Sequence, residues 1–154
     1  RHRCRCVRPD RGAPVKRADV EASMESRLLV GYGDTVRQPV ILQYAKADPF
    51  AVRVVFPYSG GGLIPAGEVE WIVSRDLLQA GMESASGVGD VHIWPLPHRG
   101  VVALQLTSND GTAVLELDAA AVELFLTSTE ELVTSGSESH DIDSILGRIF
   151  AVSS

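Results

Sequence analysis

The stretch Phe50–Tyr58, which reads FAVRVVFPY, indicates the fold of this chain more clearly than any other. Valine and phenylalanine dominate it, and β-branched and aromatic residues favour extended strands. Asp48 and Pro49 come directly before it, and the residue that precedes a proline is pushed toward extended backbone. The stretch is therefore predicted to be a strand in a β-rich domain.

Apolar patterns on either side of this stretch predict more strands and a short helix. The further strands are expected at residues 20–30, 40–45, 68–73, 91–95, 101–107 and 113–117. Ser74 is expected to cap a short helix, and Gly81 to stop it. Asp110 and Gly111 lie between the last two strands, and this dipeptide predicts a hairpin turn.

Two helices are predicted after the strands. Asp118 is expected to cap a long helix that ends at Gly136. A last helix is expected over 142–150, where apolar residues recur at helical spacing. Strands followed by helices predict an α+β class. Trp71 and Trp94 are expected to anchor the core.

The charge distribution divides the chain into an arm and a body. Residues 1–17 contain seven basic side chains and one acidic side chain, whereas the whole chain has a net charge of -6. We interpret residues 1–18 as a disordered basic arm or a non-native leader, and residues 19–154 as a single domain. The strongly acidic body is a poor match for nucleic acid. The sequence contains no run of about 18 apolar residues, so it predicts no helix that spans a membrane.

Several groups of residues could in principle carry chemistry, and each has a simpler structural interpretation. Asp90 and His92 could form a general base, but no nucleophile accompanies them. The segment containing His140, Asp141 and Asp143 could hold a metal, but helix capping is the simpler role for it. Cys4 and Cys6, with His2, offer too few ligands for a structural zinc site. We therefore predict no enzyme activity, no catalytic residues, no metal and no cofactor.

The glycine run Gly60–Gly62 lacks the lysine and hydroxyl residues of a phosphate-binding loop, and no helix follows it. We interpret it as a mobile surface loop between two strands. The alternative is a tip that binds a partner, because exposed loops on rigid sheets often carry recognition.

Four short motifs together resemble one known family. They are Asp48-Pro49-Phe50-Ala51-Val52, Glu70-Trp71, Arg75-Asp76-Leu77-Leu78 and Gly89-Asp90-Val91-His92-Ile93-Trp94-Pro95. In this order they resemble the SsgA-like sporulation and cell-division proteins of actinobacteria, over about residues 20–149. The resemblance implies a whirly-like fold of two antiparallel sheets with helices. Its order in sequence is ββββα-βββ(β)αα, and the bracketed strand is expected near residues 96–99.

The resemblance also implies a non-enzymatic adaptor that controls sporulation-specific division and septum-site selection. The implied partners are the tubulin-like division protein FtsZ and an SsgA-like paralogue, and the implied assembly is a homotrimer. The protein is then cytoplasmic, lies at division septa, meets membranes only indirectly and binds no nucleic acid. Gly136 is the residue we select as a candidate for partner docking.

Two other functions stay open on the sequence alone. By analogy, a whirly-like fold allows single-stranded nucleic-acid binding, although the acidic charge of the body argues against this function. An enzyme that uses Asp90 and His92 is the third hypothesis. A closed ring of copies would cover the exposed sheet edges, and a multivalent ring suits binding to a filament.

Overall fold

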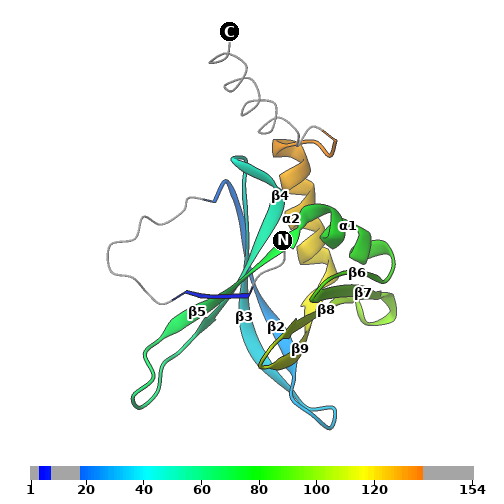
Figure 1. Ribbon diagram of the computed structural model, residues 1–154. Coiled ribbons are helices and arrows are strands. Elements are labelled where there is room, and N and C mark those ends of the chain that lie inside the picture. The colour runs from blue at the N-terminus through cyan, green and yellow to red at the C-terminus, as the bar shows by residue number, and fades with distance from the viewer. Residues whose placement is uncertain (1–3, 8–17, 137–154) are drawn as a thin grey trace, which may run out of the picture.

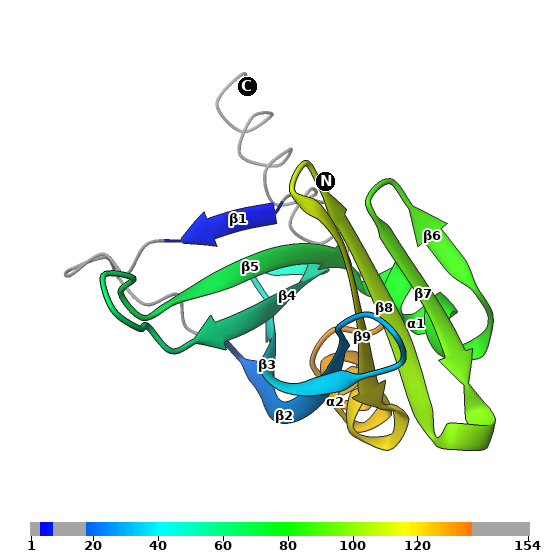
Figure 2. The same cartoon turned by 90° about the horizontal axis from the view of Figure 1, so that it is seen from below.

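Figures 1 and 2 show a computed structural model, which describes residues Cys4–Val7 and 18–136. One curled antiparallel sheet has the strand order β1-β5-β4-β3-β2-β9-β8-β7-β6. The strands are β1 (Cys4–Val7), β2 (Val20–Leu29), β3 (Thr35–Ala45), β4 (Asp48–Tyr58), β5 (Gly67–Ser74), β6 (Ser86–Val88), β7 (Val91–Leu96), β8 (Val101–Ser108) and β9 (Gly111–Asp118). The helices of the described residues are α1 (Arg75–Glu83), α2 (Ala119–Leu132) and a 3-10 turn at Pro97–Arg99. The predicted α+β class is confirmed.

The sheet has two halves that meet between β2 and β9. These strands pair at two positions, Arg27 with Glu116 and Leu28 with Leu115. The two sheets expected from the resemblance are therefore the halves of one continuous sheet. The sheet curls so that the inner faces of the two halves turn toward each other (Figure 2).

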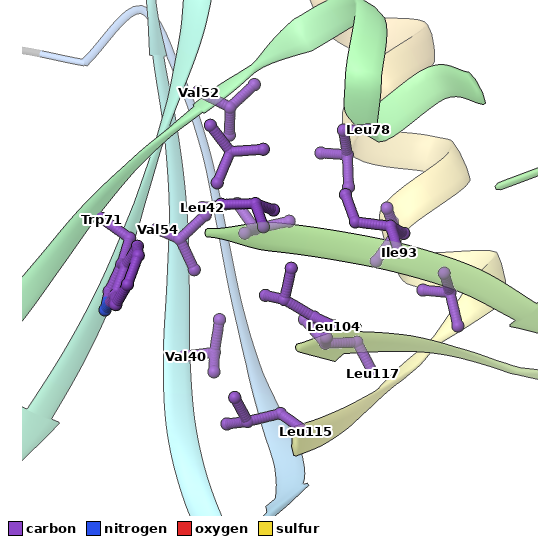
Figure 3. Close-up of a cluster of buried hydrophobic side chains, with 14 of the residues drawn as sticks. Val40, Leu42, Val52, Val54, Trp71, Leu78, Ile93, Leu104, Leu115 and Leu117 are labelled. Atoms are coloured by element: carbon purple, nitrogen blue, oxygen red, sulfur yellow. The ribbon is translucent and has the colours of Figure 1, made fainter. Parts of the chain in front are cut away.

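The core lies between these inner faces. Val40, Leu42 and Val54 from one half point toward Leu104 and Leu117 from the other (Figure 3). Both helices add side chains to the same cluster, namely Leu77, Leu78, Val122, Phe125 and Leu126. The helices therefore cover part of the concave side of the sheet, and α2 lies inside the curl.

The two tryptophans have different environments. Trp71 is buried in the core with 5% of its surface exposed, as predicted. Trp94 is half-buried on β7, next to Ile93, which is fully buried. Successive strand residues face opposite sides of a sheet, so Trp94 lies on the outer face and does not anchor the inner core.

Local capping chemistry sets the start of both helices. The Leu77 amide donates to the Ser74 hydroxyl oxygen over 3.2 Å, and the Ala121 amide donates to Asp118 Oδ2 over 3.0 Å. Each side chain satisfies a backbone amide that has no partner within the helix. Both predicted caps are confirmed.

The prediction that Gly81 stops α1 is wrong. The helix continues to Glu83, and Gly81 is buried within it. A Cβ atom at residue 81 would lie 2.3 Å from Cγ2 of Ile93. Glycine is needed here because α1 packs very closely on β7.

Strands differ from the prediction in two places. The additional strand is β6, at Ser86–Val88, whereas residues 97–99 of the expected site form a 3-10 turn. Three residues with a central glycine are too few to show an apolar pattern. In addition, β1 pairs with β5 from Cys4 opposite Trp71 to Val7 opposite Glu68, within the segment interpreted as a disordered arm.

The predicted hairpin at Asp110 and Gly111 is confirmed, since Ser108 pairs with Gly111 across a two-residue turn. The predicted helix over 142–150 lies outside the described residues. None of the helices in the described part of the chain combines the length and the apolar character needed to cross a bilayer.

Replacing Gly81 with alanine should destabilise the fold by roughly 1–3 kcal/mol, because the added methyl group overlaps Ile93. Gly61→Ala is the matched control, since a Cβ there meets nothing within 4 Å. Urea denaturation of the two variants and the parent measures the difference. Equal stability of G81A and G61A would contradict the close packing of α1 on β7.

Candidate interaction surface

Asp90 and His92 do not form an acid–base pair. Asp90 lies in the turn before β7, and His92 is exposed on β7 with its ring against Gly87. A Cβ at Gly87 would lie 2.3 Å from the His92 Cδ2 atom. No hydrogen bond or ion pair joins the two side chains within the described residues. The structure therefore does not bring together the pair considered for catalysis.

The possible metal ligands are only partly described. Within Cys4–Val7 and residues 18–136, no group of three or more His, Cys, Asp or Glu side chains could hold a metal ion. His2, His140, Asp141 and Asp143 lie outside the described residues. For Cys4 and Cys6, the structure describes the backbone of β1 alone.

Gly136 lies beyond α2, not at its cap. The helix ends at Leu132, and the amide of the cap residue Val133 donates to the Thr129 carbonyl over 2.8 Å. The expectation that Gly136 ends the helix is therefore wrong. Gly136 is exposed and has φ 92°, a left-handed conformation that favours glycine. Its role in partner docking stays a prediction.

A buried arginine holds the end of α2. Arg75 is fully buried, and its Nη1 atom donates to the carbonyls of Thr129 (3.1 Å) and Val133 (2.7 Å). Its guanidinium carbon lies 5.1 Å from the centroid of the Tyr44 ring. The Thr129 carbonyl also accepts from the Val133 amide, whereas the Val133 carbonyl lies past the end of the helix; a cation at this end of a helix is favourable. Arg75 thus links α1, α2 and β3.

Glu130 fixes the chain that follows α2. Its carboxylate accepts from the Ser135 amide at 2.9 Å, from Gln79 at 2.5 Å and from the Ser135 hydroxyl. Burial raises the pKa of this carboxyl, but the bonds from Ser135 and Gln79, together with the charge of Arg75, lower the pKa from 4.5 to about 2. The segment just before Gly136 is therefore held against α1.

Two hairpin turns carry exposed apolar residues at the end of the molecule opposite the C-terminal end of α2 (Figure 1). The β4–β5 turn exposes Leu63 and Ile64. The β2–β3 turn exposes Val30 and Tyr32, and Tyr32 has φ 52° between two glycines that also have positive φ. We call the first turn, residues 59–66, the apolar tip.

The apolar tip has a defined conformation. Gly61 and Ile64 exchange two backbone hydrogen bonds, of 2.9 and 3.0 Å, which leave Leu63 at the apex. Gly62 has φ 60°, and a Cβ at Gly60 would lie 2.3 Å from the Ile64 carbonyl oxygen. The glycine run therefore forms a tight turn that displays a fully exposed leucine, and the mobility of this loop stays a prediction.

An open apolar groove of about 440 Å³ lies on the concave side of the sheet. It is lined by strand residues and the β8–β9 turn, not by the helices, and its apolar lining includes Leu28, Phe56, Val69, Trp71, Leu106 and Leu115. Among the lining residues that the structure describes, Asp110 alone is charged. Groove and tip are thus apolar surfaces suited to contact with another molecule.

Comparison with known proteins identifies the family. The model of the family described as Streptomyces sporulation and cell division protein, SsgA, matches residues 39–138. This chain belongs to the SsgA family. The sporulation-specific cell division protein SsgB of Streptomyces coelicolor is 38% identical over 138 residues, which cover 87% of this chain and 97% of that protein. SsgB of Salinispora tropica is 34% identical over 142 residues, which cover 89% of this chain and 96% of that protein.

Solved structures of SsgA-like proteins have the same fold. One comes from work reporting that mutations in SsgB correlate to longitudinal cell division during sporulation of Streptomyces coelicolor. It gives a TM-score of 0.71 at 37% identity and covers 79% of this chain and 94% of that chain. The structure of the SsgA-like sporulation-specific cell division protein from Thermobifida fusca also gives a TM-score of 0.71, at 32% identity. It covers 84% of this chain and 93% of that chain. The resemblance inferred from the motifs is confirmed.

The motifs that identify this SsgA-family chain are largely structural. The Tyr44 hydroxyl donates to the Pro49 carbonyl over 2.9 Å, which fixes the entry to β4. Trp71 is in the core, and Arg75 holds the end of α2. Sequence reasoning found Arg75 as part of a motif but not its buried contacts, because these come from residues more than 50 positions away.

Replacing Arg75 with methionine should destabilise the protein by roughly 2–4 kcal/mol, because the Val133 carbonyl loses the Arg75 donor and the Thr129 carbonyl keeps only its bond from the Val133 amide. Arg37→Met, at an exposed position of β3, is the control. Chemical denaturation compares the two with the parent. A cost for R75M no larger than that for R37M would rule out the anchoring role.

Glu130→Gln should lower stability at neutral pH but much less near pH 2. The folded-state pKa lies below the unfolded value of 4.5, so the carboxylate stabilises the fold above that value and loses its effect as pH falls toward 2. Thermal melts from pH 7 to pH 2 measure the gap between E130Q and the parent. Glu131→Gln, at an exposed neighbour, should show no such closing of the gap.

Proposed function

We propose that this protein is a non-enzymatic adaptor in sporulation-specific cell division. Support comes from relatives named sporulation-specific cell division proteins, which share 33–39% identity with the chain. The apolar tip and the groove provide surfaces for binding other proteins, which is the chemistry an adaptor needs.

More specifically, we propose that the adaptor recruits or positions FtsZ at the site of the future septum. It works with an SsgA-like paralogue, resides in the cytoplasm at the division septum and meets the membrane through its partners. A homotrimer would offer three equal sites to one filament, so that weak single contacts add up. Residues 18–136 contain 16 acidic and six basic side chains, a balance that disfavours nucleic acid.

The role in division is tested in a sporulating actinobacterium from which the gene is deleted. Without the protein, sporulation septa should be lost, and a fluorescently tagged copy should restore them and form ladders at the septa. Microscopy of aerial filaments provides both readouts. Normal septation in the deletion strain, together with diffuse fluorescence of the tagged copy, would refute the role.

FtsZ binding is tested separately by co-sedimentation with FtsZ filaments. The intact chain should sediment with the filaments, and Gly136→Ala should weaken this if Gly136 belongs to the docking site. Gly100→Ala is the matched control, because both glycines have positive φ and open space around the Cβ position. Equal sedimentation of the two variants would exclude Gly136. If the intact chain stays in the supernatant and instead binds a labelled single-stranded oligonucleotide at low salt, the nucleic-acid alternative replaces the adaptor.

A further inference from the structure

A row of paired residues crosses the outer face of the sheet. The register places Arg37 of β3 opposite Arg27 of β2, and Arg27 opposite Glu116 of β9. From Glu116 the row continues through Ala103 of β8 to Trp94 of β7. Residues directly opposite each other in a sheet share a face. The leucines on either side of Glu116 in β9 point into the core (Figure 3), so the row faces away from it.

The one carboxylate of this row is already bound. Arg99, from the 3-10 turn after β7, donates from Nη1 to Glu116 Oε2 over 2.7 Å and from Nη2 to Oε1 over 2.8 Å. The Glu116 side chain is 5% exposed, whereas that of Arg99 is 46% exposed. A bidentate pair of this kind uses both carboxylate oxygens. Glu116 therefore offsets the charge of Arg99 and leaves that of Arg27 without a matching carboxylate.

Arg27 and Arg37 face each other across two strands. Both are exposed, and neither forms an ion pair with another described residue. Cβ atoms directly opposite in a sheet lie about 5 Å apart, and like charges at such positions are destabilising. The acidic residues next to this row on the same face are Glu25 and Asp118, and Asp118 caps α2. An anion between the two arginines would relieve their repulsion.

This concentration of positive charge is an exception on an acidic body. Residues 18–136 contain 16 acidic and six basic side chains, and three of the six are Arg27, Arg37 and Arg99. Of the others, Arg75 is buried and Arg53 pairs with a glutamate over 2.5 Å. We call Arg27, Arg37 and Arg99 the arginine row. It carries most of the accessible positive charge of the described body.

An uncharged depression lies beside the arginine row on the same face. Its volume is about 300 Å³, and its lining includes Gly87, His92, Trp94 and Gln105. None of its lining residues within the described part of the chain is acidic. Trp94 belongs to a motif that identifies the family, yet it is half-buried and does not anchor the core. Exposed tryptophan beside arginine is the composition of a protein-binding surface.

We propose that this outer face binds an acidic segment of a partner protein, which lies across the strands. Carboxylates of the segment bind Arg27 and Arg37, and an apolar side chain enters the depression at Trp94. Because neighbouring strands lie roughly 4.8 Å apart, the row from Arg37 to Trp94 is about 19 Å long. About six residues of extended chain cover that length. The inference rests on the proposed adaptor role and gives it a contact surface.

A short acidic segment fits this face better than a nucleic acid does. A long polyanion would extend past the arginine row onto a surface where acidic side chains outnumber basic ones. A protein segment can place a few carboxylates at the arginines and neutral residues elsewhere. The limited size of the row therefore favours a partner whose negative charge is local.

The first test measures binding of a labelled peptide of alternating glutamate and leucine, about eight residues long, by fluorescence anisotropy. The full chain should bind it, and added salt should weaken the binding. Arg37→Gln should weaken it roughly 3- to 10-fold, because a charge-assisted contact is lost. Lys46→Gln, the matched control, removes an exposed cation outside the row and should change affinity less than about twofold.

Urea denaturation separates loss of the contact from loss of the fold. R37Q should be at least as stable as the parent, because it removes one of two opposed like charges. Arg37→Glu should raise the urea midpoint further, since it creates an opposite-charge pair with Arg27, and it should weaken peptide binding more than R37Q does. A lower midpoint for R37E than for the parent would contradict the repulsion between the two arginines.

Three results would overturn the site. Equal peptide affinity of R37Q and K46Q would exclude the arginine row. Equal binding of a peptide of alternating lysine and leucine would show that apolar attraction alone is at work. Tighter binding of a single-stranded oligonucleotide than of the acidic peptide, weakened in R37Q, would assign the row to nucleic acid.

Co-sedimentation with FtsZ separates this site from the adaptor role. If the parent sediments with FtsZ and R37Q sediments less than K46Q, the arginine row is part of the contact with FtsZ. If all three sediment equally, the adaptor role stands and the row is excluded as its contact surface. If the parent stays in the supernatant but binds the acidic peptide in an Arg37-dependent manner, FtsZ recruitment fails while the site for an acidic segment stands.

Discussion

The pairing of β2 with β9 is the contact on which the rest of the structure depends. Two register pairs join two halves that otherwise pair only among their own strands. The sheet curls at this junction and brings the inner faces together, so that one apolar core replaces two exposed ones. Without the junction, each half would leave an open edge and an uncovered apolar face.

The curl also divides the concave side into a filled part and an open part. Side chains of α1 and α2 fill one part, and the groove occupies the other, where the polar lining residue Gln38 already has hydrogen-bond partners. Gln38 donates to the Pro57 carbonyl at 2.9 Å, and the Ser26 hydroxyl donates to the Gln38 carbonyl at 2.8 Å. Because these groups already have partners, the groove offers an incoming side chain an apolar surface at little polar cost.

The elements that sequence predicts well depend on local chemistry. Ser74 and Asp118 cap helices through amides three residues ahead, and Asp110 and Gly111 turn a hairpin, so a few neighbouring residues contain all the information. The role of Gly81 could not be predicted from its neighbours in sequence, because glycine is needed there to make room for Ile93 on β7. Strand β6 fails because three residues cannot show a period.

The candidate site divides in the same way. The glycine run at residues 60–62 could be recognised as a possible partner-binding tip, since the turn chemistry is local. The groove could not be predicted, because Leu28, Trp71 and Leu115 become neighbours only through the pairing order of the whole sheet. Arg75 is intermediate: its place in a motif is visible in sequence, but its burial depends on α2 packing nearby.

Charge explains how an acidic protein can still have a selective contact surface. Most of the described surface repels other copies and other acidic molecules at a distance, and this repulsion weakens with salt. The uncharged run of residues 54–67 and the groove, whose described lining has Asp110 as its one charged residue, carry less charge than the rest of that surface. An approach that places such a surface against another molecule loses the least electrostatic energy and gains apolar burial. The acidic body therefore disfavours orientations that place two acidic surfaces together and disfavours those that align apolar surfaces of low charge much less, and so it contributes to the specificity of docking.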